Sequence, residues 1–157
     1  MTSAGAGLTI IPAAHSTTSL NISGSMQSGG ALTVNGNNTV LALKKSSSVI
    51  ADTLTLTLNK ISVAVNSLLA SAGDMTINTG VLDIPQSTPE GTENTARIMA
   101  ATSGWGTGKI STGSKFTNTG LVYSGHDLQL TAPHIDNSST GGIITVHDLT
   151  VRANAGT

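Results

Sequence analysis

Two short segments near the C-terminal end carry the residue types of several enzyme sites. Ser124, His126 and Asp127 combine a hydroxyl, an imidazole and a carboxylate, the three groups of a hydrolytic triad. A second His-Asp pair, His147 and Asp148, follows 21 residues after the first. Two carboxylates placed one repeat apart could act as acid and base on a glycosidic bond, and two imidazoles could bind a metal ion.

Each of these chemical interpretations has a structural alternative. Adjacent side chains of an extended chain point to opposite faces, which gives Ser124, His126 and Asp127 a poor triad geometry. Both His-Asp pairs belong to a copied pattern, His-Asp-Leu-x-(Leu/Val)-x-Ala, and a repeated residue is better explained by a repeated structure. No recognised ligand spacing includes His126, His147 and the nearby His134, so we expect His126 and His147 to form a stacked pair at one corner. We therefore expect no enzymatic activity, no catalytic residue, no cofactor and no metal ligand.

The elements that would position these residues are short β-strands. Apolar and polar residues alternate in the segments "ADTLTLTLN" (51–59) and "KISVAVN" (60–66), as they do in half-buried strands. Equivalent apolar positions recur at intervals of 24, 22, 21, 53 and 21 residues, at Leu8, Leu32, Leu54, Met75, Leu128 and Leu149.

The interval of 53 residues equals two units of 21 and 11 further residues. Residues 85–95 ("PQSTPEGTENT") number 11, contain two prolines and two glutamates, and lack apolar periodicity, so we interpret them as a loop inserted between repeats. A second candidate loop, residues 103–109 ("SGWGTGK"), holds the single Trp among three glycines. Its spacing does not match that of a phosphate-binding loop.

A repeat of about 20–22 residues made of short strands predicts an all-β solenoid, a coil in which each turn, or rung, pairs with the next. One rung cannot bury its apolar face alone, but stacked rungs can. Some seven rungs at about 4.8 Å each would give a rod of about 35 Å. The whole chain, 1–157, is expected to form one such segment. An antiparallel sandwich would explain the alternation of residues but not the 21-residue offsets.

Composition excludes several classes of function. Charged residues make up 10% of the chain and the formal net charge is −1, so no basic stripe is present and we expect no nucleic-acid partner. No run of 18 apolar residues exists to span a membrane. The first residues, "MTSAGAGLTI", lack the basic and apolar regions of a signal peptide. Hydrophobic residues at 38% suffice for an aliphatic core.

Residues 118–157 resemble the repeat of filamentous haemagglutinins. The segment reads Asn-x-Gly-x-aliphatic-x-Ser-Gly-x-Asp-Leu-x-Leu-x-Ala-x-x-Ile-x-Asn, followed by Gly-Gly-x-Ile. A shorter match lies at 72–84, "AGDMTINTGVLDI". The matching residues of the long segment are Asn118, Gly120, Val122, Ser124, Gly125, Asp127, Leu128, Leu130, Ala132, Ile135, Asn137, Gly141, Gly142 and Ile144.

This resemblance implies a right-handed parallel β-helix within a larger exoprotein of a two-partner secretion system. It implies a secreted chain on the surface of a Gram-negative bacterium, an outer-membrane secretion partner, and a receptor on a host or target cell. The expected function is to form a stiff filament segment that displays surfaces for adhesion or receptor engagement. Two alternatives remain: the receptor-binding region of a contact-dependent growth inhibition effector, and a polysaccharide-cleaving β-helix enzyme or phage tailspike fragment.

The two candidate loops supply the candidate partner-binding residues. Trp105 and Lys109 lie in the second loop, and Glu90 and Glu93 lie in the first. An exposed Trp can anchor a partner, and loops on a rigid scaffold often carry binding. The alternatives are that Trp105 packs against the end of the rod and that 85–95 has no function.

Overall fold

The computed structural model describes residues 2–3, 7–12, 17–84, 96–138 and 140–153, and about 70% of these described residues lie in β-strands. Two parallel sheets account for all sixteen strands of this part. The first sheet has seven strands: β1 (Thr2–Ser3), β4 (Ser25–Ser28), β6 (Ser48–Ala51), β8 (Leu68–Ser71), β10 (Arg97–Ala100), β12 (Leu121–Ser124) and β15 (Gly142–Thr145). The second contains β2 (Leu8–Ile10), β3 (Thr18–Ile22), β5 (Ala31–Leu43), β7 (Thr53–Val63), β9 (Met75–Ile84), β11 (Thr107–Asn118), β13 (Asp127–Ala132), β14 (Ile135–Asn137) and β16 (Leu149–Ala153).

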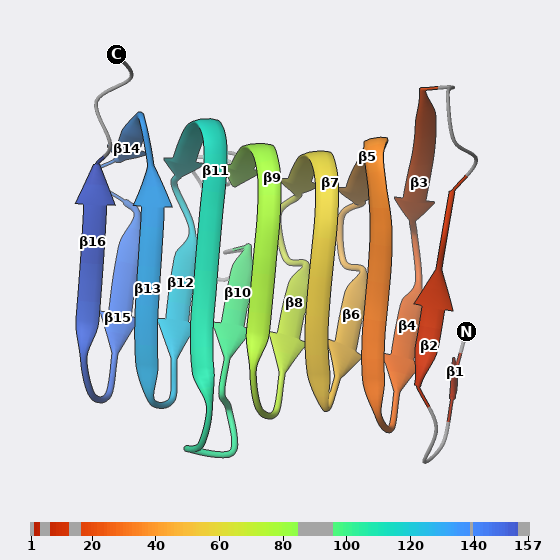
Figure 1. Ribbon diagram of the computed structural model, residues 1–157, viewed down its shortest axis with the longest axis horizontal. Coiled ribbons are helices and arrows are strands. Elements are labelled where there is room, and N and C mark those ends of the chain that lie inside the picture. Colours follow the sequence, from red (N-terminus) through yellow and green to blue (C-terminus); the bar gives the residue numbers. More distant parts are fainter. Residues whose placement is uncertain (1, 4–6, 13–16, 85–95, 139, 154–157) are drawn as a thin grey trace.

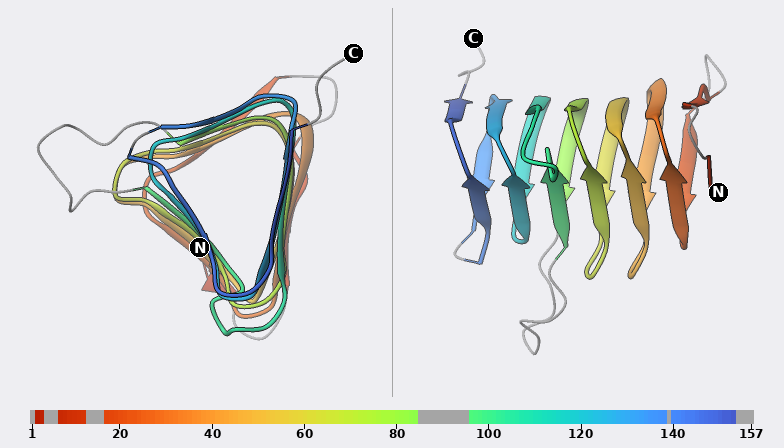
Figure 2. Two further views of the ribbon diagram at one scale, coloured as in Figure 1. Left: turned by 90° about the vertical axis from the view of Figure 1, so that its left-hand side faces the viewer. Right: turned by 90° about the horizontal axis from the view of Figure 1, so that it is seen from below.

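The chain coils through these sheets in about six turns, and every strand pairs in parallel with its equivalent in the next turn (Figure 1). Seen along its axis, the coil has a triangular outline (Figure 2). The first sheet forms one side. The second forms the other two, because its long strands bend: the first half of β5 pairs with β2 and the second half with β3. The all-β parallel solenoid predicted from the sequence is confirmed.

The rungs stack in the register that the sequence repeat predicts. Leu32 pairs with Leu54, and Leu54 pairs with Met75. Toward the other end, Leu128 pairs with Leu149. The alternation is confirmed too, since Leu54, Leu56 and Leu58 are buried while the threonines between them are half-buried or exposed.

The rung between Met75 and Leu128 differs from the simple repeat. Gly108 takes the place of the expected aliphatic residue, pairing with Met75 on one side and Leu128 on the other. A side chain at Gly108 would press on Ala100 and Leu128, which explains the glycine.

The extra residues of this rung are divided between two corners. Ile84 and Ala96 stand 12 positions apart, where the equivalent Val63 and Ser67 stand four apart. The corner between β10 and β11 is longer as well: Ala100 and Thr107 are seven positions apart, where Ser124 and Asp127 are three apart. The predicted loop 85–95 lies outside the described residues, but the strands on either side of it keep their places in the stack.

The interior of the coil is a set of aliphatic columns. One column, on the first sheet, runs through Met26, Val49, Leu69, Ile98 and Val122, each at most 5% exposed. The single Phe also enters the core. Phe116 is fully buried and pairs with Leu82 and Ile135 on the neighbouring rungs.

The C-terminal rung leaves its apolar side chains open. Leu149 and Val151 are 45% and 47% exposed, because no described strand stacks on β16. On β15 the inward residue is Ile143, which pairs with the buried Val122. Ile144, the residue matched to the repeat pattern, pairs with Tyr123 on the outer face. Within the described ranges, no helix is long and apolar enough to cross a membrane.

Candidate functional site

The two His-Asp pairs meet at one corner of the coil. His126 lies in the turn from β12 to β13 and Asp127 begins β13, while His147 and Asp148 lie in the equivalent turn one rung later. We call these four residues the His-Asp corner. It lies where the first sheet passes to the second, beside the turn that carries Trp105 (Figure 1).

Ser124, the last residue of β12 directly before this turn, has a structural role. Its side chain is fully buried, and its hydroxyl donates a hydrogen bond to the carbonyl oxygen of Asp127 over 2.7 Å. The same hydroxyl accepts a bond from the backbone N–H of His126. Because both bonds of the Ser124 hydroxyl are to the backbone of its own turn, the triad interpretation is not supported by the geometry.

Asp127 connects two rungs through one carboxylate oxygen. Oδ1 accepts a hydrogen bond from the backbone N–H of Asp148 at 3.2 Å. Asp74 does the same two rungs earlier, accepting from the N–H of Thr107 at 2.8 Å. At both positions the aspartate side chain accepts a hydrogen bond from the backbone of the next rung. This is a structural role, and it agrees with the interpretation that the repeated Asp belongs to a repeated structure.

The two imidazoles of the corner stack on each other. Their centroids are 4.7 Å apart and their planes differ by 14°. His147 Nδ1 lies 2.6 Å from Asp127 Oδ1. Because an ionised carboxylate only accepts hydrogen bonds, this nitrogen carries the proton and donates. His126 Nδ1 lies 3.4 Å from the same oxygen, and it is buried with no hydrogen-bond partner among the described residues.

This pairing shifts the acidity of both partners. The hydrogen bond from His147, followed by that from the Asp148 backbone, holds the pKa of Asp127 below its usual 3.8. The bond to Asp127, followed by the negative charge of Asp148, raises the pKa of His147 above its usual 6.5. Both shifts favour the form in which His147 carries a proton and Asp127 is ionised.

A pH dependence follows from these directions. The His147 contribution to stability is complete below pH 6.5 and is lost as pH rises through the raised pKa. The Asp127 contribution is complete above pH 3.8 and is lost as pH falls through the lowered pKa. The corner should therefore be most stable between these two values.

An NMR titration should place the His147 pKa above 6.5, and Asp127→Asn should bring it back toward 6.5. A pKa unmoved by that change, or moved equally by Asp136→Asn on a different face, would contradict the pairing.

The turn of Trp105 is the longest described corner of the coil and extends further than its neighbours (Figure 1). Trp105 is 77% exposed and is flanked by Gly104 and Gly106, both with positive φ. Its ring is roughly parallel to that of His126, with centroids 6.2 Å apart. The indole thus extends the imidazole stack of the His-Asp corner by one further ring.

Of the four predicted partner-binding residues, the structure describes two, Trp105 and Lys109. Lys109 lies in β11, exposed and close in sequence to Trp105, although the turn itself ends before Thr107. Glu90 and Glu93 lie outside the described residues. The role of all four in binding stays a prediction.

Other residues of the repeat pattern have structural roles. Asn118 is fully buried, and its amide donates to Asn137 Oδ1 at 2.8 Å and to the carbonyl of Gly142 at 3.0 Å. Glycine is required at Gly120 because a Cβ there would overlap the carbonyl oxygen of Ala96. Asn118 and Asn137, both matched to the repeat pattern, thus form a hydrogen-bonded pair on consecutive rungs.

The convergence of the two histidines on Asp127 was not predicted. The 21-residue offset places His126 and His147 in register, and the stacked pair expected from it is confirmed. The offset does not say that one carboxylate oxygen faces both rings. Trp105 was missed as their neighbour, because its rung has a longer turn. His134 does not join them, since it lies at the bend between β13 and β14.

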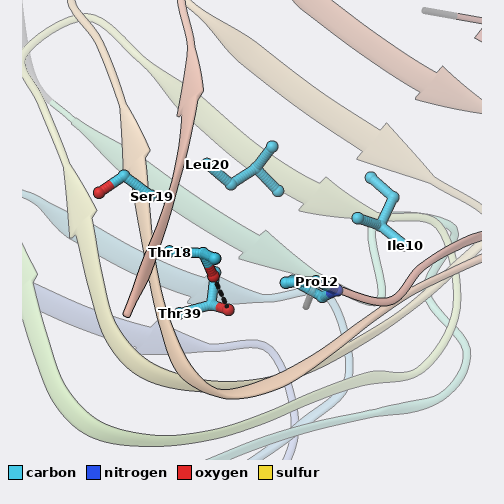
Figure 3. A pocket seen from close by; sticks show the side chains of 6 residues that line it. All are labelled: Ile10, Pro12, Thr18, Ser19, Leu20 and Thr39. Carbon is cyan, nitrogen blue, oxygen red and sulfur yellow. Dashed lines mark hydrogen bonds between the residues drawn. The ribbon is translucent and has the colours of Figure 1, made fainter. Parts of the chain in front are cut away.

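A separate apolar hollow of about 190 Å³ lies near the N-terminal end. Figure 3 shows Ile10, Pro12 and Leu20 around it, with the hydroxyls of Thr18 and Thr39 hydrogen-bonded at 2.7 Å. Residues 13–16, which link β2 and β3, are outside the described part, so we assign no ligand to this hollow.

The coil and its repeated corners define a parallel β-solenoid repeat protein. No protein-family model matches the chain, and neither a curated protein nor a solved structure does.

Proposed function

We propose that this chain is a structural and binding segment of a β-helical filament on the surface of a Gram-negative bacterium. The observation that carries the proposal is the uninterrupted in-register stack from β2 to β16, with the longer turn of Trp105 on its outside. Such a stack makes a stiff support, since each rung is held by its neighbours along the whole length. Binding would then depend on turns that project from a rigid body.

The resemblance of residues 118–157 to haemagglutinin repeats supports the surface location and export by an outer-membrane partner of the two-partner type. The pattern residues Asn118, Gly120, Ser124 and Asp127 each have a role in turning or stacking the chain. A pattern that specifies the coil is what a repeated filament needs.

We assign no reaction to the segment. Asp127 is engaged with His147 and with the next rung, and Ser124 closes its own turn. A polysaccharide-cleaving enzyme is the competing proposal. Release of new reducing ends from bacterial capsule or lipopolysaccharide preparations would favour it, and their absence at high protein concentration would favour the filament segment.

Binding can be tested with labelled protein on Gram-negative cells and on epithelial cells. We expect saturable binding that falls at least about tenfold in Trp105→Ala, because an exposed Trp anchor typically contributes about 2 kcal/mol or more. Lys109→Ala should weaken binding as well. The matched control is Lys115→Ala, since both lysines are exposed on β11 but Lys115 lies beyond its bend.

A shortened turn gives a second test, in a variant that circular dichroism must show to be folded, because Thr102 and Ser103 hydrogen-bond the carbonyls of Ser71 and Ala72 on the preceding rung. Deleting residues 102–105 joins Ala101 to Gly106 and gives this corner the same length as Ser124–Asp127. Binding by the wild type but not by this variant would place the contact on the turn. Equal binding by both would contradict that placement. Binding to bacterial but not to epithelial cells would select the growth-inhibition alternative.

A further inference from the structure

Three potential metal ligands converge at the His-Asp corner. His126, Asp127 and His147 offer nitrogen and oxygen atoms that all lie within 4.8 Å of one another. His126 and Asp127 are neighbours in one rung, and His147 belongs to the next. The parallel register of the two rungs brings His147 beside them.

His126 Nδ1 makes this cluster more than a hydrogen-bonded pair. The atom is buried, lies 3.4 Å from Asp127 Oδ1, and has no hydrogen-bond partner among the residues that the structure describes. A buried polar atom without a partner is costly unless something else satisfies it. Asp127 Oδ1, in contrast, is approached by both imidazoles.

Contrary to the expectation from the sequence, we propose that His126, Asp127 and His147 bind a divalent transition metal ion of the Zn²⁺ type. Two imidazole nitrogens and one carboxylate oxygen are a ligand set that such ions favour, and water would complete a tetrahedron. Ca²⁺ and Mg²⁺ prefer sets made of oxygen alone, so this corner selects against them.

Binding requires a local adjustment of the rings. A metal ion lies in the plane of each imidazole that holds it, whereas these two planes are nearly parallel, 14° apart. Rotation about χ2, a broad torsion in histidine, would turn the two Nδ1 atoms toward one common point beside Asp127 Oδ1. The Nδ1 proton that His147 now donates to Asp127 would be released to solvent as the ion binds.

The site would act as a clamp between rungs. His126 and Asp127 belong to a rung whose core residues Leu128 and Leu130 are buried, while His147 belongs to the rung with the exposed Leu149. An ion that binds only the folded corner stabilises it by mass action. Metal would therefore stabilise the C-terminal rung most.

The test is a titration of tag-free, metal-stripped protein with Zn²⁺ at pH 7.5. Calorimetry should give one ion per chain. Long-range ¹H–¹⁵N NMR of the imidazoles should show the Nδ1 signals of His126 and His147 moving together, while His134 stays in place. No saturable heat, or a response from only one of the two rings, would overturn the proposal.

Variants supply the second arm. His126→Ala and His147→Ala should each weaken Zn²⁺ binding at least about tenfold, since even the loss of a supporting residue typically costs 10–100-fold. His134→Ala is the control and should bind as the wild type does. Circular dichroism checks that each variant is folded. Undiminished binding by folded His126→Ala or His147→Ala protein would overturn the proposal, and the NMR titration of the wild type decides the matter if a variant does not fold.

Discussion

Leu56→Ala should lower the free energy of unfolding by about 2–5 kcal/mol. Leu56 is fully buried and lies between Val34 on the previous rung and Ile77 on the next. Truncation removes apolar contacts with both and leaves a cavity in a column that cannot close, because the backbone spacing is set by the hydrogen bonds of the sheet. Urea denaturation followed by circular dichroism measures the loss.

Thr55→Ala is the matched control for this change. Thr55 is the preceding residue of β7 and is exposed, so its truncation should cost less than about 1 kcal/mol. Hydrogen exchange should locate the effect of Leu56→Ala on β5, β7 and β9, since stability in a stack is mainly a nearest-neighbour property. Equal losses from both substitutions would show that Leu56 does not face an interior column.

Gly125→Ala should be the most damaging alanine substitution at a turn. A Cβ at this position would overlap the carbonyl oxygen of Ala101 on the preceding rung, which is backbone and has little freedom to move. Overpacking of this kind typically costs about 1–3 kcal/mol, and the register of β12 on β10 would be strained along with it. The drop in melting temperature measures the effect.

Gly24→Ala provides the comparison at another turn. A Cβ at Gly24 meets nothing within 4 Å, so the substitution should be neutral or slightly stabilising. If Gly125→Ala is as harmless as Gly24→Ala, the close approach of successive corners is wrong and the glycine of the repeat pattern needs another explanation.

The sequence predicted the parts of the fold that depend on repetition. Alternation identified which side of β7 is buried, and the 21-residue offset identified which residues pair, as Leu54 with Met75 and Leu128 with Leu149. Both follow from one requirement, that a short rung can bury its apolar face only against copies of itself.

The parts that the sequence did not predict are those where one rung differs from the next. The offset from Met75 to Leu128 showed that residues were inserted, but only the pairing of Gly108 shows that two corners share them. The pattern matched Ile144 without saying which way it faces, and the pairing shows that Ile143, not Ile144, stacks on the buried Val122. These details depend on where each turn ends, which the apolar period does not specify.

The candidate site illustrates the same limit. Equivalent spacing predicted that His126 and His147 would be neighbours, as would the two aspartates. It did not predict that one oxygen of Asp127 would face both rings while Asp148 turns to solvent, with 82% of its side chain exposed. The two aspartates differ because Asp127 accepts a hydrogen bond from the backbone of the next rung, whereas no described rung follows Asp148.

The spacing of the rungs can be measured directly by spin-label distances, because the chain has no cysteine of its own. Outward residues in register on consecutive rungs are Thr9, Thr33, Thr55, Thr76, Lys109, Gln129 and Thr150. Cysteine pairs 33/109, 33/129, 33/150 and 9/150 should give distances near 14, 19, 24 and 29 Å, rising by about 4.8 Å per rung. Distances that fail to rise with each added rung would contradict the parallel coil, and with it the proposed filament segment.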